Sequence, residues 1–151
     1  MSVEYLQLIP HDPIYIPPAQ DQPIALEALS RLLLEAAEIQ ILVYDTVQFI
    51  DQGENWESLS CPLCGSRLAT GWWQDAMDEA YKTQFENLSI TLPCCTRRTS
   101  LNNLDYQLPA GFARFVLSAR NPNLGRNLTD SELEPIERVL NCRIRQIYST
   151  Y

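Results

Sequence analysis

Apolar and polar positions alternate with clear periods along the first fifty residues and predict three successive elements. A short apolar run at residues 5–9 indicates a strand, and residues 39–50 alternate apolar and polar side chains as a longer strand does. Between them, apolar residues three and four positions apart predict a helix that Pro23 opens and that ends near Glu38. Asp45 interrupts the apolar face of the second strand. We expect a bulge or a turn there rather than a buried functional carboxylate, because burying an unpaired carboxylate is costly.

The end of the chain repeats this order of elements. Residues 113–120 alternate like a half-buried strand, and residues 143–148 form the final strand. Ser131 and Glu134 have the spacing of a helix-capping box, which places Pro135 in the first turn of the intervening helix, where proline is tolerated. The order strand–helix–strand, found twice, predicts an α+β fold: a ferredoxin-like split βαβ sandwich with an antiparallel sheet and two helices on one face.

The segment between these halves, residues 52–110, is predicted to be an inserted subdomain within a single domain that spans residues 1–151. It begins with an acidic loop and continues into a helix over residues 72–85 and a strand over residues 88–92. One side of this helix is expected to face a core, because large apolar residues recur on it every four positions: Trp73, Met77, Tyr81 and Phe85.

Four of the five cysteines fall in two tight groups inside this segment. Cys61 and Cys64 are separated by two residues and followed by Gly65, the arrangement of a zinc knuckle whose turn needs a positive φ. Cys94 and Cys95 would complete a tetrahedral set from a distant part of the chain. The sequence therefore predicts a zinc-ribbon-like site with a structural zinc ion on Cys61, Cys64, Cys94 and Cys95. A closed set of four ligands leaves no position for a substrate or a catalytic water.

The adjacency of Cys94 and Cys95 leaves the ligand set open. Successive side chains of an extended chain point apart, so both thiols can bind one ion only if a tight turn follows Pro93. Otherwise Cys142 or His11 would replace one of them. Free thiols or a redox pair are the alternatives to a bound metal.

Negative charge is concentrated at the start of the chain. The net charge is −8, and residues 1–60 contain ten acidic residues and a single basic one. Such a field repels nucleic acid and anionic membranes and attracts a basic partner. No segment has the roughly 20 apolar residues of a membrane span, and the start lacks the basic residues of a secretory leader, so we expect a cytoplasmic protein. The candidate partner surface combines an acidic loop, its tryptophan and the end of the preceding helix: Asp51, Glu54, Trp56, Glu57, Glu35 and Glu38.

Several motifs of the chain resemble a known family. They are the knuckle at residues 61–65, the tryptophan pair at 72–73, the segment Leu-Pro-Cys-Cys at 92–95, and the stretches 100–106 and 111–115. Together they look like small uncharacterised bacterial proteins that share a CPxCG…PCC metal-binding motif. The resemblance implies a bound metal and no particular activity. The small size and acidity are also similar in profile to bacterial immunity proteins, which neutralise a toxin by binding it.

Two functions follow from these observations. The first is a non-enzymatic, zinc-stabilised immunity- or antitoxin-type inhibitor that binds a basic toxin, such as a nuclease domain, through its acidic surface. The alternative is a zinc-ribbon module with a regulatory or nucleic-acid-binding role, which would use the basic and aromatic side chains near the cysteines: Lys82, Arg97, Arg98, Trp72 and Trp73. An enzyme is disfavoured, because the chain has one histidine and no phosphate-binding loop. A homodimer through a sheet edge is compatible with either function.

Overall fold

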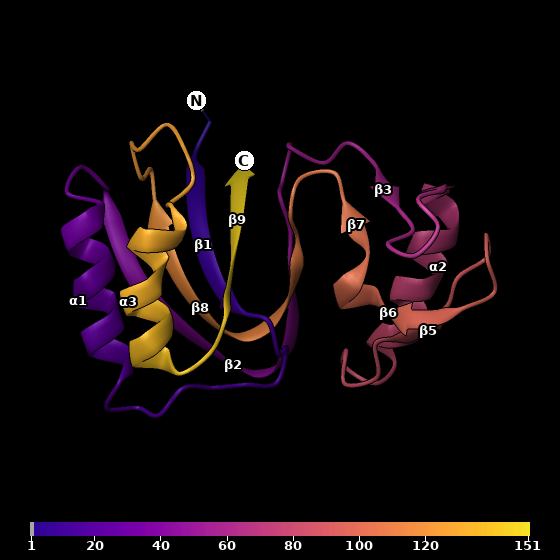
Figure 1. Cartoon of the computed structure of the whole chain (residues 1–151), viewed down its shortest axis with the longest axis horizontal. Coiled ribbons are helices and arrows are strands. Elements are labelled where there is room, and N and C mark those ends of the chain that lie inside the picture. The colour runs from indigo at the N-terminus through magenta and orange to yellow at the C-terminus, as the bar shows by residue number, and fades with distance from the viewer. Residues whose placement is uncertain (1) are drawn as a thin grey trace.

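The computed structural model describes residues 2–151 and consists of two lobes (Figure 1). We call residues 2–50 and 111–151 the sheet lobe, and residues 51–110 the cysteine lobe. The fold is of the α+β class, as the sequence predicts, and combines antiparallel sheets with three α-helices in the described residues. None of the helices in residues 2–151 is long and apolar enough to cross a membrane.

A four-stranded sheet forms the sheet lobe. Its strands are β1 (Glu4–Pro10), β2 (Glu38–Ile50), β8 (Gly111–Arg120) and β9 (Ile144–Thr150). Their order across the sheet is β2-β8-β1-β9, and every neighbouring pair is antiparallel. Strands β2 and β9 are therefore the two edges.

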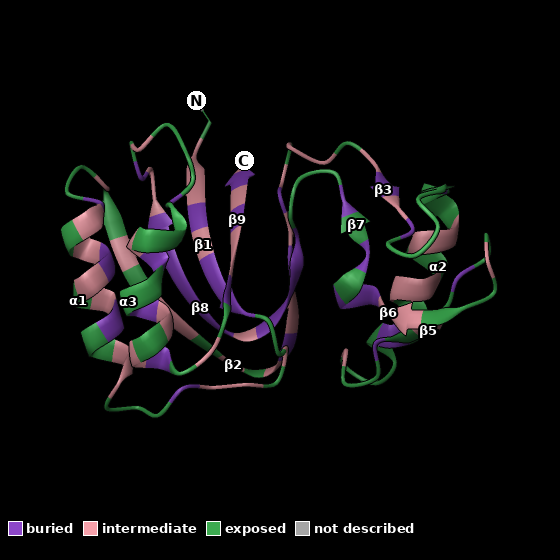
Figure 2. Cartoon of the chain, viewed as in Figure 1, coloured by how far each residue is buried: buried purple, intermediate pink, exposed green. Residues whose placement is uncertain are grey.

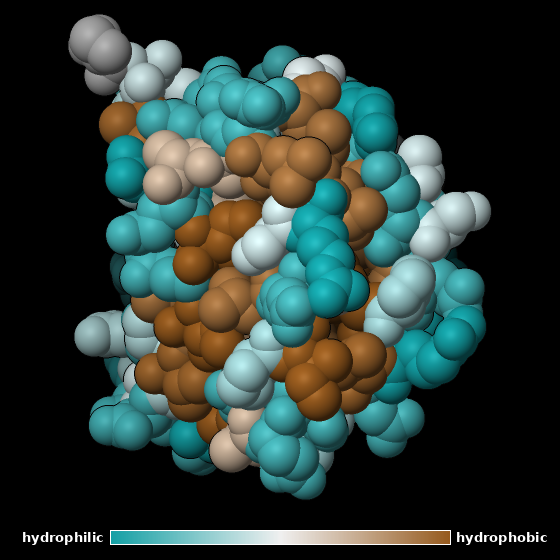
Figure 3. Space-filling view, turned by 90° about the vertical axis from the view of Figure 1, so that its left-hand side faces the viewer, coloured by the Kyte–Doolittle hydropathy of each residue, from teal (hydrophilic) through white to brown (hydrophobic). Residues whose placement is uncertain are grey.

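Two helices, α1 (Gln22–Leu32) and α3 (Asp130–Leu140), cover one face of this sheet (Figures 1 and 2). The helices and the strands bury their facing apolar side chains in a common core, whose largest fully buried members are Leu6, Leu8, Leu29, Phe115, Leu117, Ile136 and Leu140. The outward side of the helix layer is not uniformly polar, because an apolar groove of about 340 Å³ lies between α1 and α3 (Figure 3).

Helix α1 ends six residues earlier than its sequence suggests. The residues that follow Leu32 are good helix formers, yet Leu33 leaves the helical conformation and its N–H closes the helix on the Leu29 carbonyl. The N–H of Ala37 already donates to the carbonyl of Arg120 in β8. Docking on the sheet therefore overrides local helix propensity and corrects the predicted end near Glu38.

Helix α3 begins at Asp130, so the cap predicted at Ser131 is wrong by two residues. The capping box is formed by Thr129, whose hydroxyl accepts from the N–H of Glu132 while the Glu132 carboxylate accepts from the N–H of Thr129. Arg126 adds an ion pair to the same carboxylate. Pro135 consequently lies in the interior of the helix and not in its first turn.

The expected irregularity of β2 is confirmed. The pairing of β2 with β8 shifts register between Val43 and Gln48, and Asp45 lies in the bulge with an exposed side chain. Arg114 holds the bulge in place, because its Nε donates to the carbonyl of Tyr44 at 3.1 Å.

The cysteine lobe is built from short elements around a core of its own. A three-stranded sheet has the order β4-β3-β7, with β3 (Leu59–Ser60), β4 (Arg67–Leu68) and β7 (Asp105–Tyr106), and β5 (Ser89–Thr91) pairs with β6 (Arg98–Ser100). A 3-10 turn, η1 (Leu101–Asn103), follows β6. Both long strands reach this core, since Val47 of β2 and Phe112 of β8 are buried in it.

Helix α2 (Thr70–Tyr81) packs on the same core but is shorter than predicted. The chain leaves the helix after Tyr81, and Gln84 and Phe85 both have positive φ. Trp73 and Met77 face the core as expected, and Phe85 reaches it from the turn. Tyr81 is 68% exposed, so the predicted four-residue ridge is wrong at this position.

One buried amide joins the two lobes. The Nδ2 of Asn102 donates to the carbonyl of His11 at 3.0 Å, and its Oδ1 accepts from the N–H of Phe112 at 3.0 Å. Arg145 of β9 donates through Nη1 to the Asn102 and Ala110 carbonyls and to Asn102 Oδ1. This network ties η1 of the cysteine lobe to the end of β1, the start of β8 and the start of β9.

Candidate metal centre

Two hairpin turns of matching geometry bring the cysteines together. In the turn between β3 and β4, the N–H of Cys61 donates to the Ser66 carbonyl and the N–H of Gly65 donates to the Cys61 carbonyl. In the turn after β5, the N–H of Leu92 donates to the Arg97 carbonyl and the N–H of Thr96 donates to the Leu92 carbonyl. The left-handed position is occupied by Gly65 in the first turn, with φ +78°, and by Thr96 in the second, with φ +59°.

This equivalence explains how neighbouring cysteines reach one point. The same backbone hydrogen bonds are formed by residues 61–66 and by residues 92–97. In this alignment Cys95 corresponds to Cys64, and Cys94 corresponds to Leu63. The chain turns sharply after Pro93, which satisfies the condition that the sequence set for both thiols to face one ion. Leu92, at the position of Cys61, is fully buried and packs in the core instead.

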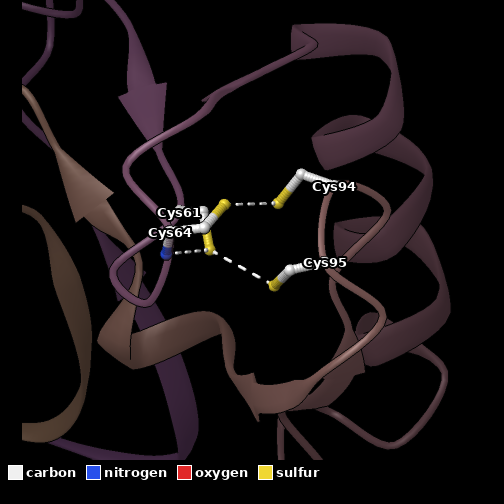
Figure 4. Close-up of side chains that lie close together, drawn as sticks. All are labelled: Cys61, Cys64, Cys94 and Cys95. Atoms are coloured by element: carbon white, nitrogen blue, oxygen red, sulfur yellow. Dashed lines mark hydrogen bonds between the residues drawn. The ribbon is translucent and has the colours of Figure 1, made fainter.

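The four sulfur atoms form a compact group (Figure 4). All four Sγ atoms lie within 4.8 Å of one another, with Cys61 and Cys95 3.9 Å apart and Cys64 and Cys94 3.4 Å apart. Four thiolates around zinc at about 2.3 Å would be separated by about 3.8 Å, so the group has the size of a tetrahedral site. Among the described residues, the group that could hold a metal consists of these four cysteines alone.

The other two candidate ligands lie elsewhere. Cys142 follows α3 and packs against the core of the sheet lobe, where burial raises its pKa to about 11. His11 follows β1 and its backbone N–H donates to Arg143. The structure therefore gives no role in this group to either residue.

Hydrogen bonds to sulfur favour the ionised form of two of the thiols, Cys64 and Cys95, whereas burial and hydrogen bonds to the other cysteines raise the pKa of Cys94 to about 12. The N–H groups of Leu63 and Cys64 point at the Sγ of Cys61 at 3.3 and 3.4 Å. Hydrogen bonds with the hydroxyl and the backbone of Ser66 lower the pKa of Cys64 to about 6. The backbone of Arg97 lowers the pKa of Cys95 in the same way. Such donors suit a metal thiolate, because a metal binds cysteine as the thiolate.

The two basic residues after the second turn have different roles. Arg97 lies beside the thiols, and its contact with Cys95 raises the pKa of the guanidinium. Arg98 is turned to the other side of the hairpin, where its Nη1 donates to the Thr91 hydroxyl at 3.1 Å. One arginine rather than two is thus available to offset the charge of a four-thiolate site.

The sequence-predicted partner residues do not form one surface. Asp51 and Glu54 flank the segment that lies along β9, whereas Glu38 begins β2 and Glu35 lies just before it, at the opposite edge of the sheet. Four strand spacings of about 4.8 Å place these two groups roughly 19 Å apart.

Trp56 is not a free anchor for a partner. Its ring packs 4.8 Å from that of Trp73 and 6.1 Å from that of Tyr106, and it is half-buried in the core of the cysteine lobe. Glu57 beside it is exposed. The acidic part of the predicted surface is therefore accessible near residues 51–57, while its aromatic part belongs to the fold.

Sequence reasoning missed two residues that shape the site and one that joins it to the sheet lobe. Ser66 and Thr96 could have been found by aligning Cys-Pro-Leu-Cys-Gly-Ser with Leu-Pro-Cys-Cys-Thr-Arg, since both segments carry proline second and cysteine fourth. Asn102 carries no such signal, because its role depends on the distant residues His11 and Arg145.

Comparisons of the chain with protein-family models, with curated proteins and with solved structures find no match.

Proposed function

We propose that this is a non-enzymatic protein-binding protein whose cysteine lobe is stabilised by a structural zinc ion. The observation that carries the proposal is the group of four thiols within 4.8 Å of one another on two matched turns. Four soft sulfur ligands in a tetrahedral arrangement suit zinc, with iron as the competing metal. Once all four are bound, the ion has no open position, which favours a structural over a catalytic role.

The small size of the surrounding elements supports a stabilising role for the metal. The strands that carry the two turns are two or three residues long, and isolated hairpins of this kind are marginal in water. A metal that cross-links them would contribute its binding free energy to folding. We therefore propose that the paired turns form a zinc-ribbon-like unit.

The sheet lobe is proposed to be a ferredoxin-like split βαβ sandwich. Three features support this assignment: the antiparallel strand order β2-β8-β1-β9, the helices α1 and α3 that follow the first and third of these strands in the chain, and their position on one face. In this view residues 51–110 are an insertion in the hairpin that joins β2 to β8.

A basic protein is the proposed partner, and an immunity- or antitoxin-type inhibitor of a basic toxin is the specific form of the proposal. Support comes from the net charge of −8 and from the exposed carboxylates of Glu54 and Glu57 beside the β9 edge. Complementary charge would accelerate encounter with a basic partner, including a nuclease that must itself attract phosphate. The separation of Glu35 and Glu38 from this loop leaves them outside the proposed surface.

Metal analysis of the purified chain tests the structural half of the proposal. We expect about one zinc per chain, lost from Cys61→Ser and from Cys95→Ser and retained by Cys142→Ser, because Cys142 is the one cysteine outside the group. If the purified protein is coloured and contains iron, the proposed structural metal is iron and not zinc. A metal-free chain that is fully folded would overturn this half of the proposal.

A capture experiment tests the binding half. The tagged chain is expected to retain one stoichiometric basic protein from a lysate of its native host, and Glu54→Lys with Glu57→Lys should abolish the retention. Glu86→Lys, with one charge reversal instead of two, is the control for position, since this exposed glutamate lies with Asp12 and Ile14 near the start of β9 while the loop pairs with its end. Equal retention by both variants would remove the acidic loop as the binding surface.

A further inference from the structure

The two edges of the main sheet are treated differently by the fold. At the β9 edge, the N–H of Glu54 donates to the Thr150 carbonyl at 2.7 Å and the N–H of Thr150 donates to the Gln52 carbonyl at 3.2 Å. The side chain of Asn55 donates to the Tyr148 carbonyl at 3.1 Å. The start of the cysteine lobe thus covers the C-terminal end of this edge, at Tyr148 and Thr150.

Hydrogen bonding fixes which backbone groups of β2 point outward at the other edge. The N–H of Asn121 donates to Glu4 in β1, so odd-numbered residues of β8 direct their backbone groups to β1 and even-numbered ones direct them to β2. Strand β2 pairs Gln40 with Ser118 and Leu42 with Val116. The N–H and C=O groups between these positions, on Ile39, Ile41 and Val43, therefore face away from the sheet.

These outward groups have no partner within residues 2–151. The side chains of the three residues are β-branched and apolar and lie on the helix side of the sheet, where Ile39 and Ile41 pack at the margin of the core. Val43 is 50% exposed. An open edge with this composition is a template for another strand.

We propose that a second copy of this chain pairs antiparallel with β2, about a two-fold axis at Ile41. This register joins Ile41 to its counterpart and Ile39 to Val43 of the partner, so that all three outward positions form hydrogen bonds in both chains. It also covers the exposed side of Val43 with an isoleucine. The two four-stranded sheets would become one of eight strands.

The chain's own β2 fits this edge better than an arbitrary strand for reasons of charge and register. Residues 39–44 contain no charged side chain. The proposed register sets Glu38 opposite Tyr44 and brings no two like charges together. A shift of two residues toward the bulge would pair Ile41 with Val43 and Ile39 with Asp45, where the alternation of β2 is lost. A shift in the other direction would push Val43 against the α1–β2 turn. The outward positions are thus fully paired in one register.

Sedimentation velocity of the zinc-loaded full chain tests the dimer. We expect a concentration-dependent rise from the 17.3 kDa monomer to twice that mass. Val43→Lys should weaken dimerisation by at least about tenfold, because it places a charge opposite Ile39 of the partner while costing the monomer little at a position that is already half exposed. Leu34→Lys is the matched control, since Leu34 is apolar and 82% exposed but lies before β2.

Amide hydrogen exchange places the contact. Exchange at Ile39, Ile41 and Val43 should slow as the concentration of the wild-type chain rises and should stay fast in Val43→Lys. A single 17.3 kDa species at all concentrations would overturn the proposal. A dimer lost in Leu34→Lys but kept in Val43→Lys would also overturn it. Either result leaves the zinc site and the acidic loop untouched, since Val43 belongs to neither.

Discussion

The sheet lobe and the cysteine lobe reach a folded state by different means. Strands of seven to thirteen residues and two amphipathic helices let the sheet lobe bury a continuous apolar core. The cysteine lobe has strands of two or three residues and a core rich in aromatic rings, closed at one end by four thiols. The apolar periodicity of a long strand or helix is sufficient to bury one of its faces in a core, whereas short strands need cross-links to be stable.

Loss of the proposed metal is expected to have the largest effect and to affect the two lobes differently. Cys61→Ser or exhaustive chelation should unfold the cysteine lobe, because structural zinc contributes on the order of 10 kcal/mol in small modules. All three tryptophans, Trp56, Trp72 and Trp73, lie in this lobe, so tryptophan emission should shift to the red while much of the far-ultraviolet circular dichroism persists. Unchanged emission from a metal-free sample would mean that the aromatic core suffices.

Truncation of a buried side chain in the sheet lobe should have the next largest effect, and this effect should be confined to the stability of the sheet lobe. Leu29 is fully buried between α1 and the sheet, so Leu29→Ala should lower the free energy of unfolding by about 2–5 kcal/mol. Metal content should be unchanged under conditions in which the variant is folded. Urea unfolding measures the stability, and metal analysis of the same sample measures the metal content. Loss of the metal from folded Leu29→Ala would show that metal binding in the cysteine lobe depends on the sheet lobe.

Substitution at the junction tests how firmly the lobes are joined. Asn102→Ala would leave the buried Phe112 N–H without a partner and remove the bond to the His11 carbonyl, at a cost of about 2–3 kcal/mol. Asn103→Ala is the neighbouring control, because Asn103 is exposed. Urea unfolding measures the difference, and equal stability of the two variants would deny Asn102 its structural role.

Substitutions in the two matched turns should have smaller effects on stability, of opposite sign in the two turns. Thr96 holds a left-handed conformation that glycine adopts without strain, so Thr96→Gly should stabilise the protein by up to about 1 kcal/mol. Gly65→Ala should destabilise it by a similar amount, since the same conformation is needed and space is open at that site. Thermal unfolding of the zinc-loaded variants would reveal both signs, and a destabilising Thr96→Gly would contradict the equivalence of the turns.

Acid should reveal the weakest effect, at the cap of α3. Hydrogen bonds from Arg126 and from the backbone of Thr129 lower the pKa of Glu132 to about 2. A depressed pKa adds stability that is fully present above the unfolded value of about 4.3 and is lost as pH falls toward the folded value. Urea midpoints between pH 2.5 and 5 should therefore fall less steeply in Glu132→Gln than in the wild type. Parallel slopes would exclude this contribution.

Prediction from sequence succeeded where periodicity is long and failed where distant contacts decide. The alternation of residues 39–50 and the interruption at Asp45 were sufficient to place β2 and its bulge. The end of α1 was not predictable, because the stop is set by Ala37 reaching Arg120, more than eighty residues away in the chain.

The candidate metal site shows the same division. Spacing alone identified the four cysteines, and the sharp turn after Pro93 was stated as a condition that the structure meets. The packing of Trp56 was not predictable, because its neighbour Trp73 comes from a different element, α2. Side-chain chemistry thus predicted the candidate metal ligands, while the residues that surround each ligand depended on the fold.

The pairing of residues 52–55 with β9 also governs how far any assembly could grow. A sheet with one open edge can accept a single additional strand and then has no further site, which gives a closed complex. Removal of residues 51–110, replaced by a tight turn between the paired positions Ile50 and Gly111, would leave both edges open. Such a shortened chain could pair with further copies at both edges and grow into a fibre. The insertion would therefore limit the assembly to a finite size.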